Sequence, residues 1–366
     1  MRSGAQNWVI ATRRHAATRR TTIADVAREA GVNKGTVSRA LRGIPGVGPS
    51  TRQRIIQTAD RLDFSASRLA SALASGRSKN IGIVLPTLRS WYFSEFASGA
   101  SEILTPAGYR VELINLDVNS DDLDVDSATF RHLFGELGAG RGRDALLLAG
   151  TIPADLFSAE DETPRVAAVA TGSPLTSVPG IFIDHRAGGR LAAEHLLGLG
   201  HRRIGIIDGR MPDRPGAWMW EHRTQGLRSA VRAAGLEIDP ADVVAPGDCH
   251  PADGERAMAE LLDRPGEKPT AIFCHTDELA FGAIATLRHR GLQCPTDISV
   301  AGFDDHPMSR YWGLTTVSQH AHEQGVRAAY ALVDVLDDNE EPAHRPVDDL
   351  TVELVIRETT GPARVS

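Results

Sequence analysis

The sequence is poor in cysteine and has no long hydrophobic run. Its 366 residues include three cysteines, Cys249, Cys274 and Cys294, without the close spacings that hold a metal or build a disulfide framework. No apolar run approaches the roughly eighteen residues that a membrane-spanning helix requires, and residues 1–20 lack the apolar core of a signal peptide. These absences exclude a disulfide-rich secreted domain and a membrane protein, so we expect a cytoplasmic protein.

Catalytic and cofactor motifs are missing as well. The sequence contains neither a nucleophile-elbow pattern nor a zinc-protease pattern. The glycine-rich stretch at 138–143 precedes a predicted strand, whereas a phosphate-binding loop follows a strand and opens a helix. His320 and His322 have no third metal ligand close by in the sequence, and we interpret them as solvated. We therefore expect no enzyme activity, no cofactor and no metal.

Charge is distributed very unevenly along the chain. Residues 1–79 contain 15 Lys and Arg against 4 Asp and Glu, a net charge of +11. The remaining residues contain 25 basic and 43 acidic side chains, a net charge of −18. A basic segment joined to an acidic body is typical of a protein whose head binds a polyanion, although a solvated basic tail has the same composition.

Residues 21–64 contain three predicted helices, each with a capping signal at its start. Thr22 with Asp25 predicts a capping box for the first helix. Asn33 is expected to cap the second helix, and Ser50 with Gln53 predicts a capping box for the third. The residues expected on the inner faces are Ile23, Val26, Ala27 and Ala30, then Thr36, Val37, Ala40 and Leu41, then Ile55, Ile56, Ala59 and Leu62.

Three short helices, the first two joined by a tight glycine turn, form a helix-turn-helix unit. Its second helix carries Lys34, Ser38 and Arg39 on the outer face, which suits a DNA major groove. Gly35 lies on the same face. Either Gly35 lets the backbone approach the duplex closely, or it is simply tolerated in a first turn.

Residues 65–79 form a linker rich in alanine and serine. Leu69 and Leu73 lie one helical turn apart, but a helix of about nine residues is marginal in water. The linker is therefore either flexible or becomes helical when a DNA minor groove buries its leucines.

Apolar stretches alternate with helical patterns along residues 80–360, which predicts parallel sheets covered by helices. Ligands of such sheets bind at the carboxyl ends of the strands. The predicted strands are 81–86, 109–116, 144–150, 165–171, 180–184, 203–208, 271–276 and 298–303.

Several motifs resemble the lactose/galactose repressor (LacI/GalR) family in order and spacing. They include "TIADVAREAGVNKGTVSRAL", "SRLASALASGR", "NIGIVLP", "EHRTQGLRSAVRAAGL" and "CHTDELAFGAIATLRHRGLQCPTDISVAGFDD". The likeness covers nearly all of residues 21–360. It implies a transcription regulator, expected to be a repressor, that binds a pseudo-palindromic operator in double-stranded DNA as a homodimer.

The resemblance also implies how the DNA is held. Family members place a hinge-helix leucine in the minor groove; Leu73 has that position here, with Ala70 on the same face. The family often has Pro-Asn before this helix, where this chain has Ala66 and Ser67. The residues expected to contact DNA are Thr22, Asn33, Lys34, Gly35, Thr36, Ser38, Arg39, Ser67, Arg68, Ala70 and Leu73.

For the body, the resemblance implies a two-lobed α/β sensor of the type I periplasmic-binding-protein kind, with an effector between the lobes. The expected parts are a basic, disordered extension at 1–20, the helix-turn-helix domain at 21–64, the hinge at 65–79, and the sensor at 80–360. Lobe 1 is expected at about 80–184 and 320–338, and lobe 2 at about 185–319 and 339–360.

Effector residues follow from matching positions in the family. Arg223 matches an arginine that holds effector oxygens, and its guanidinium suits vicinal hydroxyls or a carboxylate. Asp304 matches an aspartate that accepts effector hydroxyls, and Thr276 stands where asparagine is common. The full set of expected effector residues is Ser90, Tyr92, Phe93, Thr171, Arg223, Cys249, Thr276 and Asp304.

The effector class remains open at this point. Tyr92 or Phe93 is expected to offer a stacking surface, but Cys249 stands where the family often has an aromatic residue. The effector is expected to be carbohydrate-like, and a small polyol, a sugar acid or another polar metabolite fits as well.

Two other functions are alternatives to this one. A solute-binding protein of the same fold predicts an export signal and no basic head. A sugar-metabolising enzyme with an appended DNA-binding arm predicts turnover of its ligand.

Overall fold

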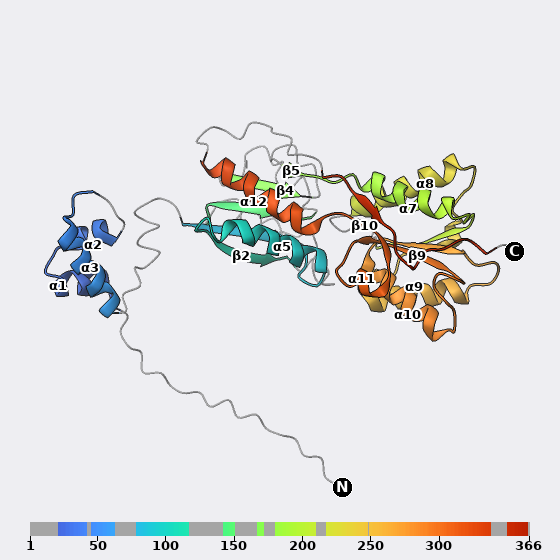
Figure 1. The fold of residues 1–366 in the computed structure, drawn as a ribbon, viewed down its shortest axis with the longest axis horizontal. Coiled ribbons are helices and arrows are strands. Elements are labelled where there is room, and N and C mark those ends of the chain that lie inside the picture. Colours follow the sequence, from blue (N-terminus) through green and yellow to red (C-terminus); the bar gives the residue numbers. More distant parts are fainter. Residues whose placement is uncertain are drawn as a thin grey trace, which may run out of the picture. The chain divides into compact units, whose positions relative to one another are not determined.

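The computed structural model of the chain shows two units, residues 1–78 and residues 79–366 (Figure 1). It describes residues 21–41, 45–62, 78–116, 142–150, 167–171, 180–209, 217–247, 249–337 and 350–364. Among these residues, no helix is both long enough and apolar enough to cross a membrane. The first unit is helical, and the second contains two β-sheets with helices packed on them.

The first unit is a three-helix bundle with a small apolar core. Val26, Val37 and Ile55, one from each helix, are completely buried. The carboxylate of Asp25 accepts hydrogen bonds from the Thr22 amide at 3.0 Å and the Thr22 hydroxyl at 2.6 Å, so the predicted start of the first helix is confirmed. The helices are α1 (Ile23–Glu29), α2 (Lys34–Leu41) and α3 (Pro49–Arg61).

Two predictions for the third helix are wrong. α3 begins at Pro49 with Gly48 as its N-cap, so Ser50 lies inside the helix instead of capping it. Proline at the first helical position has its backbone angle preset for a helix, which moves the start forward. Ile56 is 36% exposed, and Thr58, at 4%, takes the inner position, because residues three and four beyond Ile55 share its face.

The first sheet of the second unit is entirely parallel, in the order β2-β1-β3-β4-β5. Helices α5 (Trp91–Leu104) and α12 (Ala321–Asp337) pack on one of its faces, against Ile81, Ile83 and Leu147 (Figure 1). The strands are β1 (Asn80–Leu85), β2 (Arg110–Asn115), β3 (Ala145–Leu148), β4 (Ala167–Thr171) and β5 (Gly180–Ile181).

The second sheet is parallel except for β11, in the order β11-β10-β9-β8-β6-β7. Helices α7 (His185–Gly198) and α8 (Ala217–Ala233) cover one face, and α9 (Pro251–Asp263) and α10 (Asp277–His289) cover the other (Figure 1). The strands are β6 (Ile204–Ile207), β7 (Val243–Val244), β8 (Ala271–Cys274), β9 (Ser299–Asp304), β10 (Thr315–Ser318) and β11 (Glu353–Val355).

Side chains alternate between the two faces along these buried strands. In β8, Phe273 packs with α7 and α8, whereas Ile272 and Cys274 pack with α9 and α10. The chain passes from the first sheet to the second between β5 and α7, returns between β10 and α12, and passes to the second sheet again between α12 and β11. The first two crossings lie at the ends of strands, so polar residues there are shared between the two sheets.

All eight predicted strands are present, and the α/β class with parallel sheets is confirmed. β7, β10 and β11 were not predicted. β7 is two residues long, and β11 is exposed or half-buried, so neither forms an apolar run. β10 is fully buried, but its sequence, TTVS, is too short and too polar to be recognised as a buried strand.

Candidate functional site

The outer face of α2 carries the residues predicted to read DNA. Lys34, Gly35 and Arg39 are exposed, and Ser38 is half-buried. The Asn33 side-chain oxygen accepts hydrogen bonds from the Thr36 amide at 2.7 Å and the Thr36 hydroxyl at 2.9 Å. Asn33 therefore caps α2, as predicted, and the Thr36 hydroxyl is used in that cap.

Four further residues predicted to contact DNA, Ser67, Arg68, Ala70 and Leu73, lie outside the described residues. Thr22, which also belongs to the DNA set, forms the cap of α1 with Asp25. Within the described part of the head, the groups that extend outward from α2 are therefore the side chains of Lys34 and Arg39, beside the bare backbone of Gly35.

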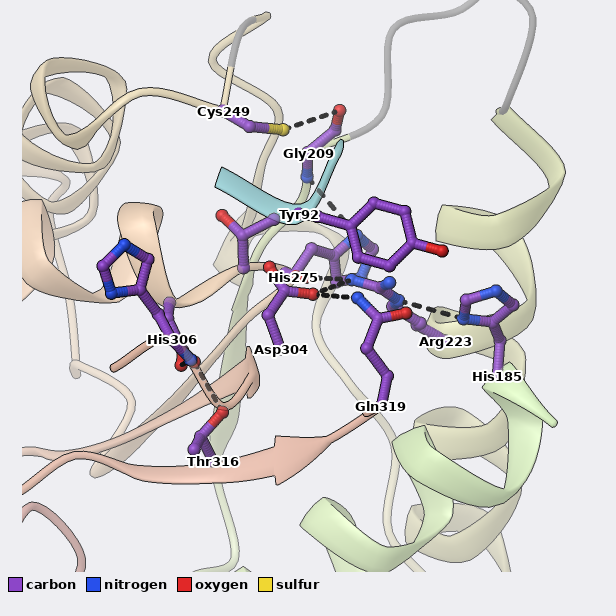
Figure 2. Close-up of polar contacts among 12 residues, drawn as sticks. Tyr92, His185, Gly209, Arg223, Cys249, His275, Asp304, His306, Thr316 and Gln319 are labelled. Atoms are coloured by element: carbon purple, nitrogen blue, oxygen red, sulfur yellow. Dashed lines mark hydrogen bonds and ion pairs between the residues drawn. The ribbon is translucent and has the colours of Figure 1, made fainter. Parts of the chain in front are cut away.

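Arg223, on α8, lies at the centre of a buried polar cluster between the two sheets (Figure 2). Its Nε donates to His185 Nδ1 at 3.3 Å, and its Nη1 donates to the main-chain oxygen of His275. Nη1 also lies 3.7 Å from Asp304 Oδ1. Nη2 donates to no residue in the described ranges, so this edge of the guanidinium faces no protein partner there.

Two aromatic rings lie against this guanidinium. The Cζ atom of Arg223 lies 3.6 Å from the ring centroid of Phe303 and 4.7 Å from that of Trp220. Cation–π contacts of this kind fix a guanidinium in its plane and leave its edges for hydrogen bonding. The arrangement holds Arg223 in one orientation.

A chain of hydrogen bonds connects Asp304 to the other sheet's helices. The side-chain amide of Gln319 donates to Asp304 Oδ1. Gln324, on α12, donates to the main-chain oxygen of Gln319 at 2.6 Å and accepts the Tyr92 hydroxyl at 2.7 Å. Tyr92 and Asp304, both predicted effector residues, are thus joined through the crossing between β10 and α12.

The backbone at Asp304 is strained. Asp304 has a φ of +125° and the next residue, Asp305, a φ of +55°. Such angles cost about 1–3 kcal/mol each and persist where the surrounding structure enforces them, often at functional sites. Arg357 contributes to that enforcement, because its guanidinium pairs with Asp305 at 2.7 Å.

Burial dominates the electrostatics of the cluster. It raises the pKa of Asp304 well above its ordinary value, and the Arg223 charge opposes that rise. It lowers the pKa of His185 well below 6.5, with the Arg223 charge acting in the same direction, so His185 is neutral. Burial also raises the pKa of Tyr92, and Asp304 adds to the rise. Within the described residues, the cluster therefore contains one permanent cation, Arg223, with the Asp304 carboxyl group 3.7 Å from it.

The other predicted effector residues lie around this cluster in different roles. Thr276 is the N-cap of α10, and its hydroxyl accepts the Leu279 amide at 3.2 Å. Cys249 lies with its sulfur 3.6 Å from the Gly209 oxygen. Thr171 is fully buried at the end of β4.

Ser90 and Phe93 lie at the start of α5. Ser90 has the N-cap position but makes no capping hydrogen bond with its side chain. The Phe93 ring is 9% exposed and packs beside Gly150 in the core of the first sheet. Its neighbour Tyr92, also in the first turn of α5, hydrogen-bonds to Gln324 and so reaches the polar cluster.

Several residues of the cluster were not predicted, although the sequence contains a signal for some of them. Trp218 and Trp220, two of the five tryptophans, lie within two turns of Arg223 on α8. Trp220 lies near Cys249, since both pack against Gly209. An aromatic surface is thus present next to the position where the sequence lacks one.

Asp208 and His275 were also missed. Both are polar residues at the carboxyl ends of predicted strands, which is where ligands of parallel sheets bind. His275 Nδ1 lies 3.0 Å from Asp208 Oδ1, and both side chains are completely buried.

His320 and His322, predicted to be solvated, are partly exposed, with 30% and 42% of their side-chain surface accessible. His320 Nε2 lies 3.1 Å from Glu353 and His322 Nε2 lies 3.2 Å from Glu102. Within the described ranges, no group of three or more His, Cys, Asp or Glu side chains is arranged to hold a metal ion.

Comparison with known families gives two matches. Residues 22–67 match the model described as "Bacterial regulatory proteins, lacI family". Residues 193–360 match the "Periplasmic binding protein-like domain" model. The first covers the helical head, and the second covers most of the second sheet and the site around Arg223.

Individual relatives are similar over nearly their whole length. The HTH-type transcriptional repressor PurR of Pasteurella multocida (strain Pm70) is 32% identical over 345 residues, 92% of this chain and 98% of that protein. The crystal structure of the lac repressor dimer bound to operator and the anti-inducer ONPF matches with a TM-score of 0.80 and 26% identity, over 94% of this chain and all of that one.

A complex of the transcriptional regulator CelR with cellobiose is also similar. It matches with a TM-score of 0.64 and 29% identity, over 93% of this chain and 100% of that one.

Proposed function

The chain belongs to the lacI family of bacterial regulatory proteins, and from this premise we propose that a small, uncharged, polyhydroxylated effector controls its affinity for operator DNA. It is a DNA-binding transcriptional regulator with an effector-binding domain. Its relatives are regulators, and we propose that this chain likewise catalyses no reaction.

The helical head is the proposed DNA-binding element. Lys34, Ser38 and Arg39 are proposed to contact base edges in the major groove, because they lie on the outer face of α2. A homodimer would present two such helices to a pseudo-palindromic operator, and the lac repressor relative binds its operator as a dimer. By family resemblance, Leu73 of each chain is proposed to enter the minor groove.

The proposed effector site is the Arg223 cluster, and one observation carries the proposal. Arg223 is buried, yet its Nη2 donates to no residue in the described ranges, and its Nη1 lies 3.7 Å from Asp304 Oδ1. A guanidinium donor next to a carboxylate acceptor suits a pair of hydroxyl groups, one accepting and one donating.

The charge of the cluster favours an uncharged effector. Arg223 is its one permanent cation among the described residues, and Asp304 already lies 3.7 Å away. An anionic ligand would bring a second negative charge into a buried site without a second cation. The desolvation penalty of that charge would exceed its electrostatic attraction to Arg223. A neutral sugar or polyol is therefore preferred to a sugar acid, and the CelR relative binds cellobiose, a neutral sugar.

The test compares neutral sugars with their acids. We expect D-ribose, D-glucose, cellobiose or a neutral polyol to raise the melting temperature and change the affinity for labelled DNA from the chain's own promoter. Ribonate and gluconate should do neither. At a hundred times Kd a ligand adds about 2.7 kcal/mol to the free energy of unfolding. A response to the acids alone would overturn the charge argument.

A variant of Arg223 tests whether the effector binds at this cluster. Arg223→Lys keeps the charge but loses the planar fork, so effector affinity should fall at least tenfold, about 1.4 kcal/mol, with operator binding unchanged. Arg186→Lys is the matched control, because Arg186 is exposed on the neighbouring helix α7. If both variants respond to the neutral ligand like the unmodified protein, the site lies elsewhere.

A further inference from the structure

Asp208 and His275 are neighbours because their strands are. β6 and β8 pair in parallel, with Ile207 opposite Cys274, so the next residue on each strand meets the other at the carboxyl edge of the sheet. The His275 amide continues the pairing by donating to the Ile207 oxygen at 3.0 Å. A carboxylate and an imidazole are thus placed side by side with no exposed surface.

The imidazole joins the strand ends to α8. Nδ1 lies 3.0 Å from Asp208 Oδ1, and Nε2 lies 3.1 Å from the Thr224 hydroxyl. Nδ1 thus faces the Asp208 carboxyl group and also the Gly209 amide, which donates to it at 3.3 Å, while Nε2 faces the Thr224 hydroxyl. Both ring nitrogens therefore have hydrogen-bond partners.

His275 also contacts the residues that flank Arg223 on α8. Its ring is stacked on Trp220, with centroids 5.8 Å apart and planes 7° apart. Trp220, Arg223 and Thr224 are spaced i, i+3 and i+4, so they share one face of the helix. The main-chain oxygen of His275 accepts Arg223 Nη1 (Figure 2). A single residue thus touches Arg223 and both of its neighbours on that face.

We propose that Asp208 and His275 are positioning residues that hold Arg223 of α8 in its ligand-binding orientation. Asp208 orients the imidazole, and the imidazole fixes Thr224 and Trp220, so the guanidinium between them has one position. Removing one member leaves a buried polar partner unpaired, which loosens this face of α8. The inference rests on the proposed role of Arg223 in effector binding.

The test uses Asp208→Asn and Thr224→Val and measures the exchange of the Arg223 Nε proton by NMR, without effector. Arg223→Lys assigns the signal. In the unmodified protein this proton is protected by burial and by its hydrogen bond to His185. Both variants should exchange it at least tenfold faster. Exchange rates equal to those of the unmodified protein would overturn the proposal.

Thr286→Val is the matched control for a merely structural effect. Thr286 is 7% exposed, Thr224 is 3% exposed, and the Thr286 hydroxyl makes one hydrogen bond, to the Glu255 oxygen at 3.2 Å on the opposite face of the sheet. Thr286→Val should change the exchange rate of the Arg223 Nε proton by less than twofold. An equal acceleration by Thr286→Val would show that general loosening, not positioning, sets the rate.

A measurement on the unmodified protein guards against variants that do not fold. The ¹⁵N spectrum of His275 should show both ring nitrogens hydrogen-bonded in a single tautomer; an imidazole that exchanges between tautomers would contradict the proposal. The exchange experiment reports on Arg223 alone. Protected exchange together with no response to neutral sugars would therefore count against the proposed effector class and not against the positioning residues.

Discussion

At the scale of single residues, two adjacent carboxyl groups at the start of α10 bind protons unusually tightly. Burial raises the pKa of Asp277 to about 6, although hydrogen bonds from Ser309, Thr316 and the His306 amide oppose the rise. Burial raises the pKa of Glu278 to about 7, opposed by a hydrogen bond from the Trp91 amide. Trp91 belongs to α5 on the first sheet, so Glu278 connects the two sheets on the side of the α5 start.

The raised pKa of Glu278 predicts how stability depends on pH. Between about pH 4.5 and 7 the folded protein holds a proton that the unfolded chain releases, so the free energy of unfolding falls as pH rises through this range. Glu278→Gln should remove part of that fall, on the order of 1–2 kcal/mol. Urea unfolding at pH 5 and pH 7.5 measures the difference.

The control for this prediction is Glu260→Gln on α9, a surface carboxylate paired with Arg264. It should leave the pH dependence of the unmodified protein in place, because exposed pairs contribute little. A Glu278→Gln variant with the same pH dependence as the unmodified protein would show that the carboxyl group titrates normally.

At the scale of elements, the first turn of α2 contains a glycine, Gly35. Gly35 does not have a positive φ, and a Cβ at this position would meet only Asn33 Oδ1, at an ordinary 3.4 Å. Neither the backbone nor the packing of the head thus requires glycine here. Alanine is the better helix former by up to about 1 kcal/mol.

Gly35→Ala therefore separates the two interpretations of this residue. The variant should raise the free energy of unfolding of the head slightly, because α2 gains helix propensity. If Gly35 serves close approach to DNA, operator affinity should nevertheless fall at least tenfold. Circular dichroism melting and fluorescence anisotropy measure the two quantities, and unchanged operator affinity would show that glycine is only tolerated.

The elements also show what the sequence could predict and what it could not. Capping residues and strand runs are local, and they predicted α1, α2 and eight of the strands correctly. The start of α3 was mispredicted because Pro49 outweighed the Ser50 capping pattern. Asp208 and His275 become meaningful only when β6 and β8 pair, and nothing local indicates that pairing.

The cluster around Arg223 likewise depends on contacts between residues that are far apart in the sequence. Arg223 and Asp304 were predicted through family resemblance, and the structure brings them to 3.7 Å. Gln324 joins them to Tyr92 through a contact between residues 232 positions apart in the chain, which no spacing pattern reveals. The effector roles of these residues remain predictions that the ligand experiments address.

At the scale of the whole molecule, the two parts of the chain carry opposite net charges. We expect the net charge of +11 in residues 1–79 to attract any duplex and the net charge of −18 in the remainder to repel it. Non-specific attraction to phosphates gives no preference for an operator, so specificity requires contacts to base edges or to the shape of a groove. For the effector to change operator affinity selectively, it must act on these contacts. Because the coupling between the two binding sites is reciprocal, DNA binding then changes effector affinity by the same factor.

Leu73→Ala tests where that specificity comes from. Loss of an apolar wedge should lower affinity for the operator at least tenfold but leave affinity for random DNA unchanged. The slope of log affinity against log salt should also stay the same, because no phosphate contact is lost. Leu69→Ala, one turn away in the same linker, is the matched control and should have a smaller effect. Equal losses on operator and random DNA would mean that Leu73 supports folding or general binding, and that the minor groove is not where this chain recognises its operator.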